Sequence, residues 1–319
     1  MSRIVQYSEN GGLDRLRVSE GETPEAGPGE VRVRVLYAGL NPVDWKILSG
    51  AFGPVEGTAG NGADFSGVVD QVGDGVEGFS PGDLVFGGHI AGAQAEHIVV
   101  GRPARRLHRV PRGLGIDAAG GLNIAGRTAI AGIRAIAPAQ GETVYISGAS
   151  GGVGIIAAQL ALNLGARVIG GASEANHALL RSLGIEPLAY GEGLEQRLRD
   201  AAPEGLHAAY STQDQAEVEL LLSLDVPADR INAIGAGPQV AEDRGVRVDG
   251  TANARPEDLD WLAQAIAYGH LHLPVARVFA LEEVREAYRF LREAHPAGKV
   301  LLRLEAAPLT EEQRRSLTS

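Results

Sequence analysis

A glycine-rich turn between a strand pattern and a helix pattern is the part of this chain whose residues are best suited to chemistry. The run 143–147 ends in Gly148-Ala-Ser-Gly-Gly-Val-Gly154, and an apolar helix pattern covers 152–164. Such a turn directs backbone N–H groups and the positive end of a helix dipole at one point, which suits the pyrophosphate of a dinucleotide. Against the pattern Gly-x-Gly-x-x-Gly, Ala149 replaces the first glycine. The residues expected to line this site are Ala149, Gly151, Gly152, Val153 and Gly154.

The residues after the next expected strand, at 166–170, bear on the choice between NAD and NADP. In an NAD site an Asp or Glu about 20 residues after the turn accepts hydrogen bonds from the adenosine ribose. Here the strand tip reads Gly170-Gly-Ala-Ser173 and has no carboxylate. Ser173 can donate to the extra phosphate of NADP, with Asn176, His177 or Arg181 as partners. We therefore expect NADP(H) as the cofactor.

Composition limits the function classes that fit. A chain of 319 residues suggests about two domains, and its net charge of −11 argues against a nucleic-acid partner. There is no cysteine, so disulfides, thiolate catalysis and cysteine-based zinc sites are excluded. The N-terminus lacks the apolar core of a signal peptide, and the uncharged stretch 143–166 is interpreted as a buried strand and helix. We expect a cytoplasmic protein with no membrane association.

The order of the expected elements divides the chain into three segments. Residues 1–100 are rich in strand patterns such as Val31–Val35, with a period of two. From about residue 123, helices at 128–137, 152–164 and 174–183 alternate with strands at 143–147 and 166–170, and further strands are expected at 208–210, 230–234 and 246–248. This alternation predicts an open, doubly wound parallel sheet. The segment after helix 256–268, with strands at 275–279 and 300–304 and a helix at 281–294, is expected to rejoin the first domain.

Several spaced motifs resemble one protein superfamily. They are Ala38-Gly-Leu-Asn-Pro-Val-Asp-Trp45, Gly62-Ala-Asp-Phe-Ser-Gly-Val-Val69, Gly82-Asp-Leu-Val85, Ala95-Glu96, Thr128-Ala129, the glycine turn and Gly298-Lys-Val300. Together they are similar to the medium-chain dehydrogenase/reductase superfamily, in its zinc-independent quinone oxidoreductase branch. The resemblance implies an α/β fold with a mostly-β GroES-like domain, 1–123 completed by 265–319, and a Rossmann domain at 124–264. It also implies hydride transfer from NADPH to quinones or α,β-unsaturated carbonyls.

Two stretches depart from the zinc-dependent relatives. Those relatives place a Cys near Asn41 and a Gly-His-Glu near Gly62, where this chain reads Leu40-Asn-Pro42 and Asn61-Gly-Ala-Asp64. A site built on His270-x-His272 is the alternative, since both side chains can share one face of a strand. We favour surface histidines and expect no metal.

The stretch Asn41-Pro-Val-Asp44 fits two interpretations. It matches a helix start, with Asn41 as N-cap, Pro42 at the first helical position and Asp44 in the first turn. The resemblance implies that Asn41 lies beside the nicotinamide, where its amide can orient the cofactor or a substrate carbonyl. Trp45 and Phe52 can stack on an aromatic substrate or pack in a core. The candidate catalytic residues are Asn41, Asp44 and Trp45, and the proton donor is open between water, Tyr37 and Asp44.

The resemblance also implies further cofactor contacts. Lys299 belongs to a motif that approaches the cofactor in relatives, and Tyr190 matches a tyrosine near the cofactor phosphates. An ordinary lysine at a strand edge and a tyrosine at a strand end are the alternatives. The expected cofactor-binding set is completed by Thr128, Ile234 and Gly235.

Two positions depart from the branch itself. Residues 208–214 read Ala-Ala-Tyr-Ser-Thr-Gln-Asp, where relatives end a strand in aspartate followed by a later glycine, and Asn123 stands where proline is common. The first departure makes the cofactor-binding edge at 208–214 unusual. The second, Asn123, lies where the chain is expected to cross from the first domain to the second.

Three functions are compatible with these residues. The leading hypothesis is an NADPH-dependent reductase of a small quinone or enone, in which the protein mainly positions the reactants. The alternatives are a pathway-specific enoyl reductase acting on a carrier-bound substrate and a non-catalytic NADPH-binding sensor or structural protein. A homodimer is expected from the resemblance and from the candidate edge strand Gly245-Val-Arg-Val-Asp249.

Overall fold

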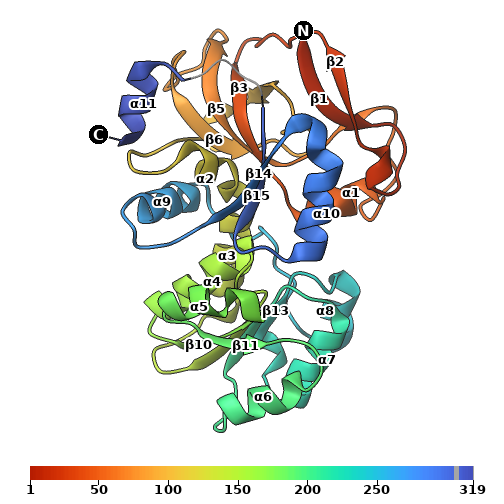
Figure 1. Cartoon of the computed structure of the whole chain (residues 1–319), viewed down its shortest axis with the longest axis vertical. Helices are drawn as coiled ribbons and strands as arrows, with labels where there is room; N and C mark the ends of the chain where they lie inside the picture. Colours follow the sequence, from red (N-terminus) through yellow and green to blue (C-terminus); the bar gives the residue numbers. More distant parts are fainter. Residues whose placement is uncertain (305–308, 319) are drawn as a thin grey trace. The chain divides into compact units, whose positions relative to one another are not determined.

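The computed structural model describes residues 1–304 and 309–318, which fall into two compact units (Figure 1). The terminal unit comprises residues 1–124 together with the described part of 256–319. The central unit comprises residues 125–255.

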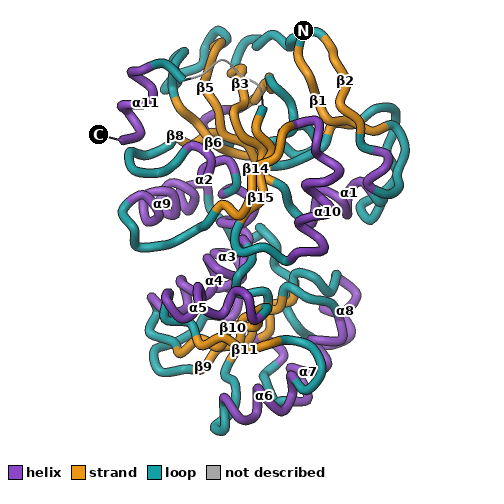
Figure 2. Tube along the Cα trace, viewed as in Figure 1, coloured by secondary structure: helices purple, strands orange, loops and turns teal. Residues whose placement is uncertain are grey.

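Two sheets form the framework of the terminal unit (Figure 2). The smaller has the order β2-β1-β4, and the larger has the order β14-β15-β3-β5-β6-β8, with β7 also paired to β3. Their strands are β1 (Ser2–Tyr7), β2 (Arg17–Gly21), β3 (Glu30–Gly39), β4 (Ala59–Gly60), β5 (Asp64–Val72), β6 (Leu84–Gly88), β7 (His97–Gly101), β8 (Leu107–Arg109), β14 (Val275–Ala280) and β15 (Lys299–Arg303). Among these strands, β14 and β15 pair in parallel and the other pairs are antiparallel.

The long strand β3 organises this unit because its alternating valines point into the core. Val31, Val33 and Val35 are fully buried, as the period-two pattern predicts. On one edge β3 pairs antiparallel with β15, with Gly39 opposite Leu301. The C-terminal strand therefore completes a sheet whose centre comes from the N-terminal part of the chain.

Short helices cover the sheets of the terminal unit. They are α1 (Pro42–Leu48), α2 (Ile116–Gly120), α9 (Pro256–Ala267), α10 (Val284–Ala294) and α11 (Glu311–Thr318), with 3-10 turns at 13–15, 103–105 and 281–283. Helix α10 buries Val284, Ala287 and Tyr288 in the same core as β3. The hydroxyl group of Tyr288 therefore lies in an apolar core, where it needs hydrogen-bond partners.

The central unit is a five-stranded parallel sheet in the order β11-β10-β9-β12-β13. Its strands are β9 (Thr143–Ser147), β10 (Arg167–Ala172), β11 (Glu186–Ala189), β12 (Ala208–Ser211) and β13 (Ile231–Ala233). Its helices are α4 (Gly152–Asn163), α5 (His177–Ser182), α6 (Leu194–Ala201), α7 (Gln215–Ser223) and α8 (Pro238–Arg244), with 3-10 turns at 174–176 and 228–230, while α3 (Leu122–Ile136) enters it from the terminal unit. The predicted α/β fold class, with a parallel Rossmann-type sheet, is confirmed.

The strand predicted at 246–248, within the candidate edge strand 245–249, is wrong. Only one isolated parallel bridge forms there, between Asn232 and Arg247. Gly245 ends α8 in the left-handed conformation, with φ of 69°. Beyond the bridge, the side chain of Asn232 donates to Asp249 O and accepts from Asp249 N. The Asn232 side chain thus occupies the N–H and carbonyl groups of Asp249, which would have paired with backbone groups in a longer strand.

None of the helices in the described ranges is both long enough and apolar enough to cross a membrane.

Candidate functional site

The glycine turn after β9 is closed so tightly that no side chain fits at the third glycine position of the pattern. A Cβ on Gly154 would lie 2.1 Å from the carbonyl oxygen of Gly148. Gly151, the N-cap of α4, has an ordinary φ of −74°, and a Cβ there would lie 3.3 Å from the same oxygen. The first turn of α4 has no acidic residue. The positive end of this 12-residue helix is thus free of a competing carboxylate, which suits a phosphate ligand.

Most of the other residues expected to bind a cofactor follow the carboxyl ends of the parallel strands. Ser173, Asn176 and His177 follow β10, Tyr190 follows β11, and Ile234 and Gly235 follow β13. Gly235 also has a steric reason to be glycine, because a Cβ would lie 2.1 Å from the carbonyl oxygen of Gln213. This edge is the usual ligand side of an open α/β sheet.

Two expected residues lie elsewhere. Thr128 is buried on α3, and its carbonyl oxygen accepts a hydrogen bond of 2.9 Å from the hydroxyl of Tyr210. Lys299 belongs to the terminal unit.

One side chain connects the glycine turn to the tip of β10. The Asn176 amide donates to Ser150 Oγ at 3.0 Å and to Ser173 Oγ at 3.1 Å. The strand continues through Ala172, which is buried, so Ser173 is the first residue beyond it. The strand therefore ends two residues later than the expected range 166–170.

A carboxylate that the sequence interpretation missed lies beside the end of β12. Glu217 on α7 accepts hydrogen bonds from the hydroxyl groups of Ser211 and Tyr145. Burial raises the pKa of this carboxyl group above its ordinary value. The signal was present in the sequence as an acidic residue in the first turn of a helix that follows a strand.

In the terminal unit, Asn41 is the N-cap of α1, as the helix-start interpretation predicts. Its backbone N–H donates to Asp44 Oδ2 at 2.8 Å, and Pro42 occupies the first helical position. The carboxylate of Asp44 thus closes the helix start, which leaves the side chain of Asn41 for other partners.

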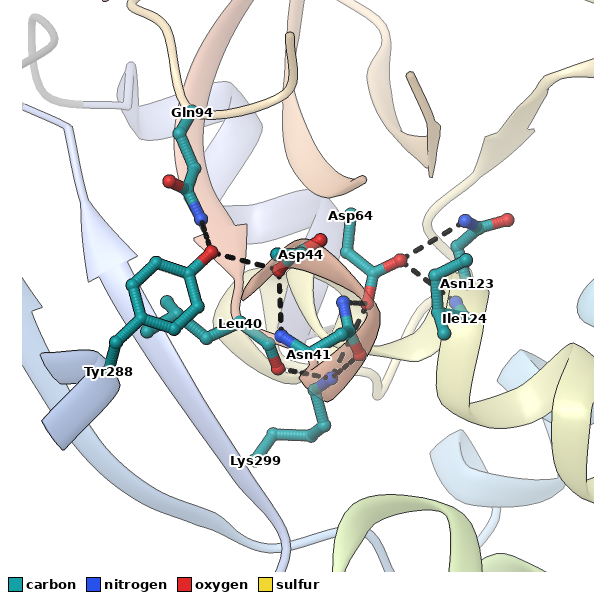
Figure 3. A network of polar contacts seen from close by, with 9 residues as sticks. All are labelled: Leu40, Asn41, Asp44, Asp64, Gln94, Asn123, Ile124, Tyr288 and Lys299. Atoms are coloured by element: carbon teal, nitrogen blue, oxygen red, sulfur yellow. Dashed lines mark hydrogen bonds and ion pairs between the residues drawn. The ribbon is translucent and has the colours of Figure 1, made fainter. Parts of the chain in front are cut away.

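Those partners are a buried lysine and a buried aspartate (Figure 3). Lys299 Nζ donates to Asn41 Oδ1 at 2.6 Å and to Leu40 O at 2.9 Å, and it lies 3.4 Å from Asp64 Oδ2. Asn41 Nδ2 donates to the same Asp64 oxygen at 2.9 Å. The other oxygen, Asp64 Oδ1, accepts from Asn123 Nδ2 at 3.1 Å and from the backbone N–H of Ile124 at 2.8 Å. The unusual Asn123 is therefore used to hold Asp64.

A second set of buried polar groups adjoins the first through Asp44 (Figure 3). The hydroxyl of Tyr288 donates to Asp44 Oδ2 at 2.9 Å and accepts from the amides of Gln94 and Asn61 at 2.7 and 2.8 Å. Asp44 Oδ1 is buried with no hydrogen-bond partner among the described residues. Burial and then the charge of Asp64 raise the pKa of Asp44 from 3.8 to about 7.

Trp45 and Phe52 differ in their surroundings. The ring of Trp45 packs edge-on against Tyr288, with centroids 6.1 Å apart, and contacts the core of the terminal unit. Phe52 is 70% exposed. The packing alternative thus describes Trp45 in this structure, and a substrate contact of either ring stays a prediction.

The residues present do not fit a zinc ion. No group of three or more metal-binding side chains occurs within residues 1–304 and 309–318, and the whole chain has no cysteine. At the two stretches where zinc-dependent relatives have their ligands, Asn41 and Asp64 surround the Lys299 ammonium. Asp64 already has a cation, so a divalent ion would have to displace it.

Comparison with known proteins agrees with this architecture. Residues 27–125 match the family of alcohol dehydrogenase GroES-like domains, and residues 196–302 match the family described as zinc-binding dehydrogenase. The chain is 31% identical over 93% of its length to a pikromycin polyketide synthase component of Streptomyces venezuelae, but it spans only 8% of that protein. It is 28% identical over 95% of its length to a quinone oxidoreductase of Pseudomonas aeruginosa and spans 99% of it.

A solved structure extends the agreement to the fold. A mycobacterial protein complexed with NADPH superposes with a TM-score of 0.82 at 25% identity, covering 95% of this chain and all of the other. A single family assignment agrees with the order of both sheets, the glycine turn and the two family matches. The chain belongs to the medium-chain dehydrogenase/reductase superfamily, in its quinone oxidoreductase-like branch.

Proposed function

We propose that this protein is an NADPH-dependent, zinc-independent oxidoreductase that reduces a quinone or an α,β-unsaturated carbonyl compound. The observation that carries the proposal is the turn after β9, in which Gly154 approaches Gly148 too closely for any side chain. A backbone surface of this kind lets a pyrophosphate approach the N-terminus of a helix. Membership in the quinone oxidoreductase-like branch and the NADPH bound to a solved relative support the choice of cofactor.

Two groups of residues would hold and orient the reactants. The backbone N–H groups of Gly152, Val153 and Gly154 would bind the pyrophosphate, since that of Gly151 already donates to the carbonyl oxygen of Gly148. The hydroxyl of Ser173 would donate to the ribose phosphate. The Asn41 amide would orient the carbonyl of the substrate or of the nicotinamide. NADPH, when bound, supplies the hydride for an electron-poor carbon. The protein contributes position and hydrogen bonds to the oxygen on which charge develops.

A second candidate is an enoyl reductase whose substrate is a thioester on a carrier. The similarity to a segment of a polyketide synthase, at 31% identity over 93% of this chain, favours it. Both candidates use the same turn and the same amide, so they differ only in the acceptor.

The test is NADPH oxidation by the purified protein with a panel of quinones, small enones and acyl thioesters. We expect turnover with at least one class, and the preferred class decides between the two candidates. A Gly151→Val variant is the control, because its side chain would occupy the space of the pyrophosphate. NADPH binding without turnover on any acceptor would indicate a sensor or structural protein instead.

A further inference from the structure

The amide of Asn41 is held by two partners of opposite hydrogen-bonding character. Lys299 Nζ lies 2.6 Å from its oxygen, and Asp64 Oδ2 lies 2.9 Å from its nitrogen. An ammonium group can only donate, and a carboxylate can only accept. The amide therefore has one chemically allowed orientation, with its oxygen toward Lys299 and its nitrogen toward Asp64.

Lys299 and Asp64 are buried, and their hydrogen-bonding groups all have partners within the protein. The three hydrogens of the Lys299 ammonium have three acceptors, namely Leu40 O, Asn41 Oδ1 and Asp64 Oδ2. Both Asp64 oxygens accept hydrogen bonds, and the residue is fully buried, while Lys299 is 4% exposed. Neither side chain has a free group with which to contact a ligand.

Asn41, in contrast, keeps one polar hydrogen unused. Its Nδ2 carries two hydrogens, one of which goes to Asp64, and no described residue accepts the other. Asn41 is only 3% exposed, so water does not compete freely for that hydrogen. Leaving a buried donor unpaired is costly, which is typical of a group that awaits a ligand.

We propose that Lys299 and Asp64 are positioning residues that present the second amide hydrogen of Asn41 as a donor to a carbonyl oxygen in the reaction. This inference rests on the proposed function, which supplies a carbonyl that becomes electron-rich when hydride adds to its conjugated system. A donor fixed in advance stabilises that charge without reorganising. Lys299 acts only through Asn41 and does not touch substrate or cofactor.

The kinetic test is a double-mutant cycle between the lysine and the asparagine. Asn41→Ala and Lys299→Met should each lower kcat on the order of 100-fold, while KM and the Kd for NADPH change little. The combined variant should be no slower than Asn41→Ala alone, because Lys299 has no route to the reaction except through Asn41. Lys46→Met, which removes the only other lysine of the chain from a half-buried position on α1, should leave kcat unchanged.

A second variant covers the case in which Lys299→Met does not fold because it strands a buried carboxylate. Asp64→Asn combined with Lys299→Met removes both charges together and leaves an acceptor for the N–H of Ile124. It should fold and show the same loss of kcat. Wild-type kcat in this folded variant, or additive losses in the cycle, would overturn the proposal.

A spectroscopic measurement keeps the inference separate from the proposed function. In protein labelled with ¹⁵N-asparagine, the resonance of the Asn41 side-chain amide is identified by its loss in Asn41→Ala. Its two protons should have clearly different shifts and exchange rates, and the charge-neutral double variant should reduce that difference. An unchanged Asn41 amide resonance would refute the positioning role even if the protein reduced every acceptor. If no acceptor is reduced, the proposed function fails, and this measurement still decides whether Lys299 and Asp64 orient the amide.

Discussion

Asp44 belongs to both sets of buried polar groups in the terminal unit, the set around Asn41 and the set around Tyr288. Its Oδ2 accepts from Tyr288 and from the backbone of Asn41, whereas its Oδ1 has no partner in the described part of the chain. The carboxyl groups of Asp44 and Asp64 both lie in this buried region with the ammonium group of Lys299. Of the two, only Asp64 contacts that ammonium group. Burial and the charge of Asp64 raise the pKa of Asp44 to about 7. The vacant Oδ1 is the position for the retained proton.

We predict that this proton makes stability depend on pH. Between 3.8, the ordinary value, and about 7, the folded protein binds more protons at Asp44 than the unfolded chain does. The contribution of this group to the free energy of unfolding is therefore full at low pH and is lost as pH rises to about 7. The Tm of the wild type minus that of Asp44→Asn should fall across this window and then level off. A constant difference from acid to neutral pH would contradict the prediction.

At Ser173 the structure sharpens the prediction of cofactor preference. Its Oγ accepts from Asn176, and no described residue accepts its hydroxyl hydrogen, so it can donate to a ribose phosphate. A charge-assisted hydrogen bond is worth about 1.5–3 kcal/mol, so kcat/KM should favour NADPH over NADH by roughly 10- to 100-fold. Ser173→Asp should reverse the preference through repulsion of the phosphate. Equal kcat/KM values for the two cofactors in the wild type would show that this position does not discriminate.

In the turn between β9 and α4, we predict that Gly151 matters for cofactor binding and Gly154 for folding. Gly151→Val should keep the Tm within a few degrees but abolish NADPH binding, because Gly151 has ordinary backbone angles and its Cβ would meet a backbone oxygen at 3.3 Å, a contact that a small shift relieves. Gly154→Ala should instead lower the Tm strongly, since its Cβ would lie 2.1 Å from a backbone oxygen. Thermal melts and NADPH fluorescence titrations of both variants check this. Unchanged NADPH affinity in Gly151→Val would show that the pyrophosphate binds elsewhere.

Elements whose signals are local were predictable from the sequence, and contacts between distant segments were not. Strand β9 matches its predicted range and helix α4 ends one residue before its predicted end, because a β-branched run, a glycine turn and an apolar helix pattern follow one another. The bond between Tyr288 and Asp44 joins residues 244 positions apart, and nothing in either segment indicates the other. Similarly, the strand predicted at 246–248 had the right pattern, but a single side chain, Asn232, took over its pairing.

For the molecule as a whole, the homodimer stays a prediction that rests on the family resemblance. The candidate edge strand at 245–249 makes only one bridge, between Asn232 and Arg247. The opposite edge, β11, contains Pro187, which lacks an N–H group and discourages pairing with another chain. Light scattering at micromolar concentration should give about twice the mass of the 33.3 kDa chain. A monomer throughout that concentration range would contradict the prediction.

The whole molecule should also function without a metal, although one of its matched families is described as zinc-binding. A zinc ion needs several neutral or anionic ligands, and here Asp64, which accepts from the Asn41 amide, is already paired with the ammonium of Lys299. Bringing a divalent cation beside that ammonium would add repulsion between two positive charges in a buried region. We expect elemental analysis to find far less than one zinc per chain, and treatment with a chelator to leave NADPH oxidation and the Tm unchanged. One tightly bound zinc per chain, with activity lost on chelation and restored by zinc, would contradict the prediction and show that zinc has ligands other than Asn41 and Asp64.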